Sequence, residues 1–139
     1  MRILTSVLVF DLGGTQLRAG WFADGALARV SRMSSDVVRG GGDPAALLEA
    51  AMLDLAAQVT DGEPGAVSLA VPGPVHDGVA GRLPSLLGPG YQGGLDFEAL
   101  ARRLWPGRPV FASNDLTGDD YAPVFESIAR SIRFLDATP

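Results

Sequence analysis

The sequence contains no cysteine, no lysine and a single histidine, His76. Without cysteine, the chain can form no disulfide, no thiolate metal site and no thiol nucleophile. All eleven cationic residues are arginines, so the lysine of a Walker A phosphate loop and the amine of a Schiff base are both missing. One histidine also excludes a histidine-rich metal cluster within a single chain.

The charge and the apolar content indicate a soluble globular protein. The formal net charge is −5 and no basic stripe stands out, so nucleic acid is not an expected partner. No segment approaches the ~20 consecutive apolar residues of a membrane span. Apolar residues make up 47% of the 139 residues, which predicts a packed core and one domain over residues 1–139.

The first ten residues, MRILTSVLVF, place Arg2 before an apolar run and could be mistaken for a signal peptide. The run is short, it stops at Asp11, and no small-residue cleavage site follows it. We therefore expect a cytoplasmic protein.

The pattern of apolar residues predicts a mixed α/β fold. Asp24-Gly25 is a strong hairpin turn between two of the first three strands. Asp43 followed by Pro44 is typical of a helix start. The predicted strands cover residues 3–10, 16–23, 26–33, 66–71 and 109–113. The predicted helices cover residues 44–60, 95–105 and 119–135, the first of them ended by Gly62.

Three antiparallel strands followed by helix-crossover strands predict a mixed sheet whose later strands run parallel to the first. Open α/β sheets bind ligands at the carboxyl ends of their strands. We therefore expect three loops, at residues 11–15, 72–78 and 114–117, to gather at one edge of the sheet.

The segment DLGGT at residues 11–15 combines a carboxylate, two glycines and a hydroxyl between two predicted strands. Glycines let the backbone approach a ligand closely, and successive amide N–H groups can bind phosphate oxygens. A carboxylate just before such a turn can hold Mg²⁺ through water, because Mg²⁺ dehydrates reluctantly. The alternative interpretation is an ordinary glycine hairpin in which Asp11 bonds its own turn.

Two further loops carry candidate ligand-binding groups. Residues 72–78, PGPVHDG, form a stiff turn that can position backbone against a small ligand, although the same residues can simply stop a strand. In residues 113–117, SNDLT, a carboxylate can accept a hydroxyl proton beside an amide that orients a substrate. A helix cap is the alternative for this Asn-Asp pair.

Together, DLGGT at 11–15, VPGP at 71–74 and the Asn114-Asp115 pair resemble the amino-terminal lobe of bacterial glucokinases and of the wider ROK family. The element order resembles the ribonuclease-H-like lobe shared by actin, Hsp70 and hexokinases. The resemblance covers nearly the whole chain and implies a mixed five-stranded sheet in the order βββαβαβα. The ROK zinc motif, built from cysteines and a histidine, has no counterpart here.

The resemblance also implies roles for single residues. Asp115 would be the general base that takes the proton from the attacking sugar hydroxyl, and Asn114 would bind the sugar. The residues implied to contact the nucleotide phosphates or their Mg²⁺ are Asp11, Gly13, Gly14 and Thr15, with Asp11 reaching the metal through water. Those implied to line the sugar cleft are Pro72, Gly73 and Gly78. ATP and Mg²⁺ are the implied cofactors, and the implied partner is a hexose or a related sugar.

Members of this family have two lobes, and the sequence ends at Pro139, where the second, adenosine-binding lobe would begin. We therefore expect the amino-terminal lobe of an ATP:hexose phosphotransferase that is inactive alone. A second chain or a homodimer partner would then complete the cleft. The alternative is a non-catalytic sugar- or partner-binding regulatory module of ROK type. An actin-like or Hsp70-like ATPase fragment is disfavoured, because those relatives act on water and have no sugar pocket.

Overall fold

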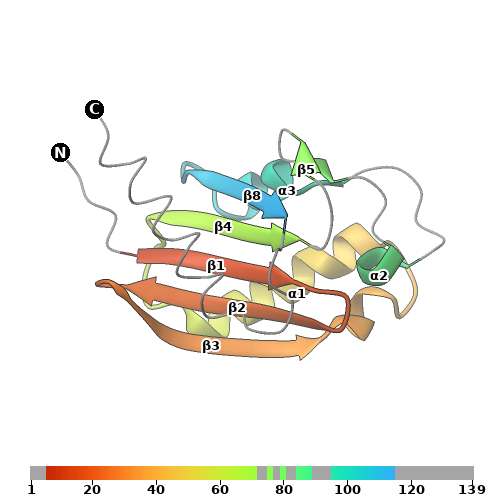
Figure 1. Cartoon of the computed structure of the whole chain (residues 1–139), viewed down its shortest axis with the longest axis horizontal. Helices are drawn as coiled ribbons and strands as arrows, with labels where there is room; N and C mark the ends of the chain where they lie inside the picture. Colours follow the sequence, from red (N-terminus) through yellow and green to blue (C-terminus); the bar gives the residue numbers. More distant parts are fainter. Residues whose placement is uncertain (1–5, 72–74, 77–78, 81–83, 89–94, 115–139) are drawn as a thin grey trace.

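The computed structural model describes residues 6–71, 75–76, 79–80, 84–88 and 95–114. Within them, five strands form one mixed sheet in the order β3-β2-β1-β4-β8 (Figure 1). Strands β1 to β3 are antiparallel neighbours, whereas β4 is parallel to β1 and β8 is parallel to β4. The strands are Ser6–Leu12 (β1), Gln16–Ala23 (β2), Ala26–Ser34 (β3), Ala66–Val71 (β4) and Val110–Asn114 (β8). The predicted mixed five-stranded sheet is confirmed.

The turn between β2 and β3 has the conformation that its sequence predicts. Asp24 and Gly25 have φ angles of 53° and 85°, and the pair Ala23 and Ala26 closes the ladder around them. Positive φ at both central residues defines the two-residue turn whose twist matches that of the flanking strands. This hairpin brings β3 back along β2 and fixes where β3 ends.

Helix α1 (Pro44–Val59) begins as predicted but ends earlier. The Asp43 side chain accepts the N–H of Ala45, and proline occupies the first turn, where its missing N–H costs nothing. At the other end, the N–H and hydroxyl of Thr60 both donate to the Ala56 carbonyl. The predicted stop at Gly62 was wrong, since that residue (φ 94°) lies in the turn toward β4.

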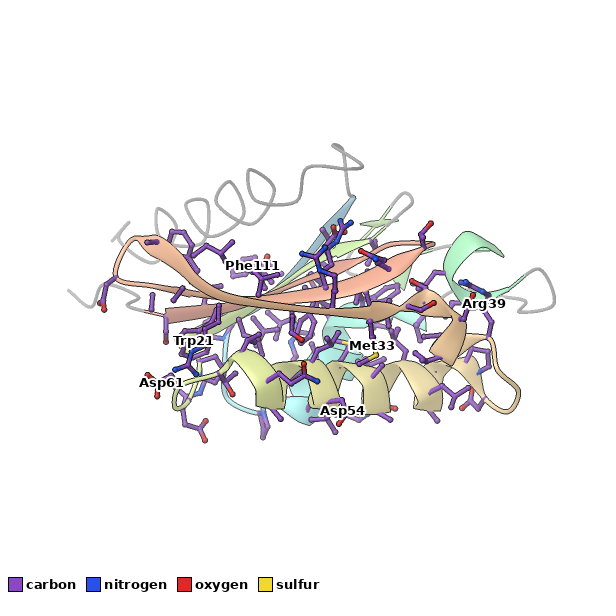
Figure 2. The ribbon with its side chains drawn as sticks, turned by 90° about the horizontal axis from the view of Figure 1, so that it is seen from below. Trp21, Met33, Arg39, Asp54, Asp61 and Phe111 are labelled. Carbon is purple, nitrogen blue, oxygen red and sulfur yellow. The ribbon has the colours of Figure 1, made fainter. Side chains whose placement is uncertain are left out.

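The main core lies between the sheet and helices α1 and α3 (Phe97–Leu104). Figure 2 shows α1 along one face of the sheet, with Trp21 and Met33 directed toward it and Asp54 on its outer side. The rings of Phe10 and Trp105 pack with their centroids 5.5 Å apart. A smaller cluster lies on the opposite face, where Phe111 is seen in Figure 2. Its buried members are Val7, Val9, Phe22 and Ala66.

Five short elements were absent from the sequence prediction. A second, three-stranded sheet pairs β5 (Val75–His76), β6 (Val79–Ala80) and β7 (Leu95–Asp96). Helix α2 covers Pro84–Leu87, and the 3₁₀ helix η1 covers Ser35–Val38.

The predicted helix over 95–105 was wrong at its start, because the Asp96 side chain accepts the N–H of Ala99 and caps a helix that begins at Phe97. The helix predicted over 119–135 lies outside the described residues. None of the helices within the described ranges has the length and apolarity needed to cross a membrane.

Candidate functional site

The carboxyl ends of β1, β4 and β8 meet at one edge of the main sheet, because these strands run in the same direction (Figure 1). The register pairs Asp11 with Ala70, Ala70 with Ser113, and Val71 with Asn114. Since neighbouring strands are about 4.8 Å apart, Asp11 and Ser113 are separated by roughly 10 Å of sheet. The sequence prediction that these strand ends share one edge is therefore confirmed.

Several predicted site residues lie beyond the part of the chain that the structure describes. Asn114 is the last residue of β8, so it belongs to the strand rather than to the loop that was predicted to begin there. The residues that follow β4 and β8 and fall outside the described ranges are Pro72, Gly73, Gly78 and Asp115. Their roles stay predictions.

Asp11 is a buried strand residue, not a loop residue as predicted, with only 2% of its surface exposed. It sits opposite Arg18 in the β1–β2 ladder, and Arg18 Nη1 donates to its Oδ2 at 3.1 Å. The second guanidinium nitrogen of Arg18, Nη2, donates to Gln16 Oε1 at 3.3 Å. Because side chains alternate along a strand, Asp11 lies on the same face as Val9, away from α1. A buried carboxylate and a guanidinium therefore form an ion pair between β1 and β2, next to the loop of the hairpin.

The hairpin itself comprises Gly13, Gly14 and Thr15. The Gly13 N–H donates to the Gln16 carbonyl at 3.0 Å, and a Cβ added at Gly13 would lie only 3.1 Å from that same oxygen. The described glycines with positive φ lie elsewhere, at Gly25, Gly41, Gly42, Gly62, Gly88 and Gly107. Glycine at position 13 is therefore favoured by close backbone packing and not by backbone torsion.

Two residues at the tip of the hairpin keep exposed surface. Thr15 is exposed and Gly14 is partly exposed. Across the described ranges, no protein group accepts a hydrogen bond from the N–H of Gly14 or of Thr15. Two adjacent backbone donors with access to solvent are the groups that phosphate oxygens use in glycine-rich turns.

Ser35, which sequence reasoning missed, forms two hydrogen bonds to the loop of the hairpin. It is fully buried at the start of η1. Its N–H donates to the Thr15 carbonyl at 2.9 Å, and its hydroxyl donates to the Gly13 carbonyl at 2.6 Å. Counting from the Asp24-Gly25 turn would not have found it, because a register shift between Trp21 and Phe22 changes the partner of Gln16 from Met33 to Ser34 and so brings Ser35 beside the loop.

The described groups at this edge are better suited to a phosphate, which accepts hydrogen bonds from backbone N–H groups, than to a metal ion bound by protein side chains alone. No three acidic or histidine side chains of the described segments come together as a metal site. Among the described residues, Asp11 is the carboxylate nearest the hairpin in sequence, so a cation here would need its other ligands from water or from a bound phosphate. The chemistry of the site is thus consistent with a magnesium–phosphate ligand.

Comparison with known proteins identifies the fold. No protein-family model matches the sequence, and no curated protein sequence does. Among solved structures, a ROK hexokinase from Thermus thermophilus is 30% identical over 78% of this chain and 35% of its own, with a TM-score of 0.56. A glucokinase from Parabacteroides distasonis is 24% identical over 99% of this chain and 39% of its own, with a TM-score of 0.60.

Two further similar structures are a kinase with bound ligands and a transcriptional regulator. A ROK family glucokinase from Streptomyces griseus, in complex with glucose and AMPPNP, is 18% identical over 78% of this chain and 33% of its own, with a TM-score of 0.60. A ROK family transcriptional regulator, a homologue of the E. coli MLC protein, is 18% identical with a TM-score of 0.51 over 79% of this chain. The chain spans about a third of the length of these structures. The resemblance to ROK glucokinases and sugar kinases is confirmed.

Proposed function

We propose that the chain is the amino-terminal lobe of an ATP-dependent sugar kinase of ROK type, which transfers a phosphoryl group to a hexose hydroxyl. The observation that carries the proposal is the shared sheet edge, where the DLGGT hairpin, the end of β4 and Asn114 come together. The 30% identity with a ROK hexokinase supports the same assignment. Because the chain spans only about a third of that protein, turnover would require the rest of the two-lobed structure.

In this proposal the hairpin binds the ATP phosphates. The N–H groups of Gly14 and Thr15 supply donors, and the absence of a side chain at Gly13 allows the backbone to fold closely on itself. Asp11 would hold Mg²⁺ through water, and the metal would supply positive charge to the phosphates. Arg18 fixes the Asp11 carboxylate at the floor of the site, so the acid is held in place before any ligand arrives.

Residues that follow β4 and β8 would complete the sugar side. Asp115 would accept the proton of the attacking hydroxyl while that oxygen forms a bond to the γ-phosphorus, and the bond from phosphorus to the β–γ bridging oxygen breaks to release ADP. Asn114 would orient the sugar by hydrogen bonds, and Pro72, Gly73 and Gly78 would line the cleft. Alignment and charge stabilisation are the main requirements of phosphoryl transfer, and in this proposal the residues at this edge would supply both.

A regulatory module that binds a sugar or a partner without catalysis is the second candidate, and the similarity to a ROK family transcriptional regulator favours it. The two functions share a fold and differ in chemistry, since a regulator needs a binding site but no general base.

Hexose-dependent ADP release by a two-lobed protein that carries this lobe separates the two candidates. The proposal expects release with at least one hexose, and glucose is the first to try. Sugar binding without ADP release, across a panel of hexoses with Mg·ATP present, would support the regulatory module instead. For the 139-residue chain alone we expect only weak Mg·ATP binding, and tight binding in titration calorimetry would contradict the two-lobe proposal.

A further inference from the structure

Ser35 is the buried side chain whose contacts converge on the hairpin. Its N–H and its hydroxyl donate to two different carbonyls of the same loop, those of Thr15 and Gly13. The serine has no exposed surface, and its contact with Gly13 bridges 22 positions of sequence. The backbone N–H would bond to Thr15 with most residues at this position, so the bond to the Gly13 carbonyl is the one that requires the serine hydroxyl.

The direction of each carbonyl fixes the direction of the next amide. In a trans peptide unit the C=O and the following N–H point in opposite directions, and no cis peptide is found in the described segments. The Gly13 carbonyl points at the Ser35 hydroxyl, so the N–H of Gly14 points away from Ser35. Because that N–H has no acceptor among the described residues, the bond from Ser35 directs an available donor to the opposite side of the peptide.

The element that carries Ser35 is itself held in place. The Ser34 side chain accepts the N–H of Asp36 and caps η1. At the other end, Arg39 Nη2 donates to Asp36 Oδ1 at 2.7 Å, and its Nη1 donates to the Leu86 carbonyl of α2 at 3.1 Å. Figure 2 shows Arg39 at the right-hand end of the molecule, beyond the label of Met33. These hydrogen bonds fix η1 in place, so Ser35 is positioned to keep the 13–15 loop in one conformation.

We infer that Ser35 is a positioning residue, which orients the Gly14 amide for a phosphate oxygen by hydrogen bonding to the preceding carbonyl. The inference rests on the proposed function, in which the hairpin binds phosphates. It assigns a role to a residue outside the DLGGT motif, one that acts through the backbone and touches no ligand itself.

The test is a titration of the ¹⁵N-labelled 139-residue chain with inorganic triphosphate and Mg²⁺, followed at the amide signals of Gly14 and Thr15. Inorganic triphosphate is chosen because it needs only the hairpin and no adenosine site. We expect these signals to shift in the parent chain. Ser35→Ala should weaken binding about tenfold, the effect of one lost hydrogen bond. Ser31→Ala is the matched control, since that exposed hydroxyl bonds to Gln58 far from the loop, and it should titrate like the parent.

Each other outcome has a defined meaning. If Ser35→Ala binds triphosphate as tightly as the parent, Ser35 has no positioning role and the inference fails, while the proposed function stands. If the parent shows no shift at all, the hairpin does not bind phosphate, and the inference and the phosphate role fail together. Should Ser35→Ala not fold, Ser35→Cys decides the question, because its thiol is a weak donor of similar size and should give a smaller loss.

Discussion

Arg18 and Asp11 face each other across the β1–β2 ladder, and Arg18 Nη1 lies 3.1 Å from Asp11 Oδ2. The side chains are only 17% and 3% exposed, so both charges have been largely withdrawn from water. Such a pair is weak evidence for stability, because the lost hydration opposes the attraction between the charges. The arginine makes the burial of the carboxylate tolerable, and in the proposed function that carboxylate is retained to bind Mg²⁺ through water.

Removing Arg18 should therefore be costly. Arg18→Gln removes the guanidinium that pairs with the buried Asp11 carboxylate, and the loss of one partner of a buried pair costs about 3–5 kcal/mol. Because Arg18 keeps some exposure, we expect the free energy of unfolding to fall by about 2–4 kcal/mol, measured by urea denaturation of the 139-residue chain.

Arg102→Gln is the matched control for this prediction. Arg102 pairs with Glu98 at 3.3 Å one helical turn away, and its side chain is 58% exposed. Exposed pairs of this kind contribute about 0.3–0.5 kcal/mol. Equal losses for the two variants would mean that the Asp11 carboxylate gains no more from its arginine than a surface glutamate does.

The second prediction concerns Gly13. A methyl group there would lie 3.1 Å from the Gln16 carbonyl oxygen, so Gly13→Ala must move backbone that closes the hairpin. We expect destabilisation of about 1–3 kcal/mol together with weaker binding of Mg²⁺–triphosphate. Gly40→Ala is the control, because its Cβ would meet the nearest atom, the Asp36 carbonyl oxygen, at an ordinary 3.7 Å. That variant should keep triphosphate binding and lose no stability.

Ser68 provides a third prediction, about the core of the sheet. Its side chain is buried in β4, and no hydrogen-bond partner of its hydroxyl is present among the described residues. A buried hydroxyl without a partner is unfavourable, so Ser68→Ala should leave stability unchanged or raise it by about 1 kcal/mol.

Ser6 offers the comparison for that substitution, since its hydroxyl accepts the N–H of Gly65 at 3.2 Å, a donor it shares with the Ser6 carbonyl at 3.0 Å. Because the bond to the carbonyl remains, Ser6→Ala should lower the unfolding free energy by about 0.5 kcal/mol, the lower end of the range for one hydrogen bond. A loss at Ser68 as large as the loss at Ser6 would show that the Ser68 hydroxyl is hydrogen-bonded after all, for example to an internal water.

Local sequence signals predicted the parts of the fold that depend on neighbouring residues. Asp24-Gly25 carries its own turn preference, and Asp43-Pro44 carries a cap and a preset first turn, so both were predictable. The strands of the small second sheet have two residues each, too few for any periodicity to be visible. The start of α3 was missed because Asp96 both pairs with Val79 and caps the helix, and a pattern of apolar residues cannot separate these roles.

Part of the candidate site was predictable from the sequence, and part of it depended on the three-dimensional structure. The DLGGT motif and the shared strand edge followed from sequence, since each depends on a short motif or on the direction of parallel strands. The partner of Asp11 could have been found by counting across the hairpin, which places Arg18 directly opposite. Ser35 could not be found from any motif, because its role depends on where β3 ends relative to a loop some 20 residues earlier.

The last prediction concerns Asp115, on which the proposed chemistry depends. Asp115→Asn keeps the size of the side chain and can still bond a sugar hydroxyl, but it cannot accept a proton. In the two-lobed enzyme, kcat should fall about 10²–10⁴-fold, the usual range for a lost general base, with little change in sugar affinity. Steady-state ADP release and sugar titration measure the two quantities separately. Asp119→Asn and Asp120→Asn are the controls and should retain activity. If Asp115→Asn were as active as the parent while one of these controls was inactive, the base would lie further along the chain and the assignment of Asp115 would be wrong.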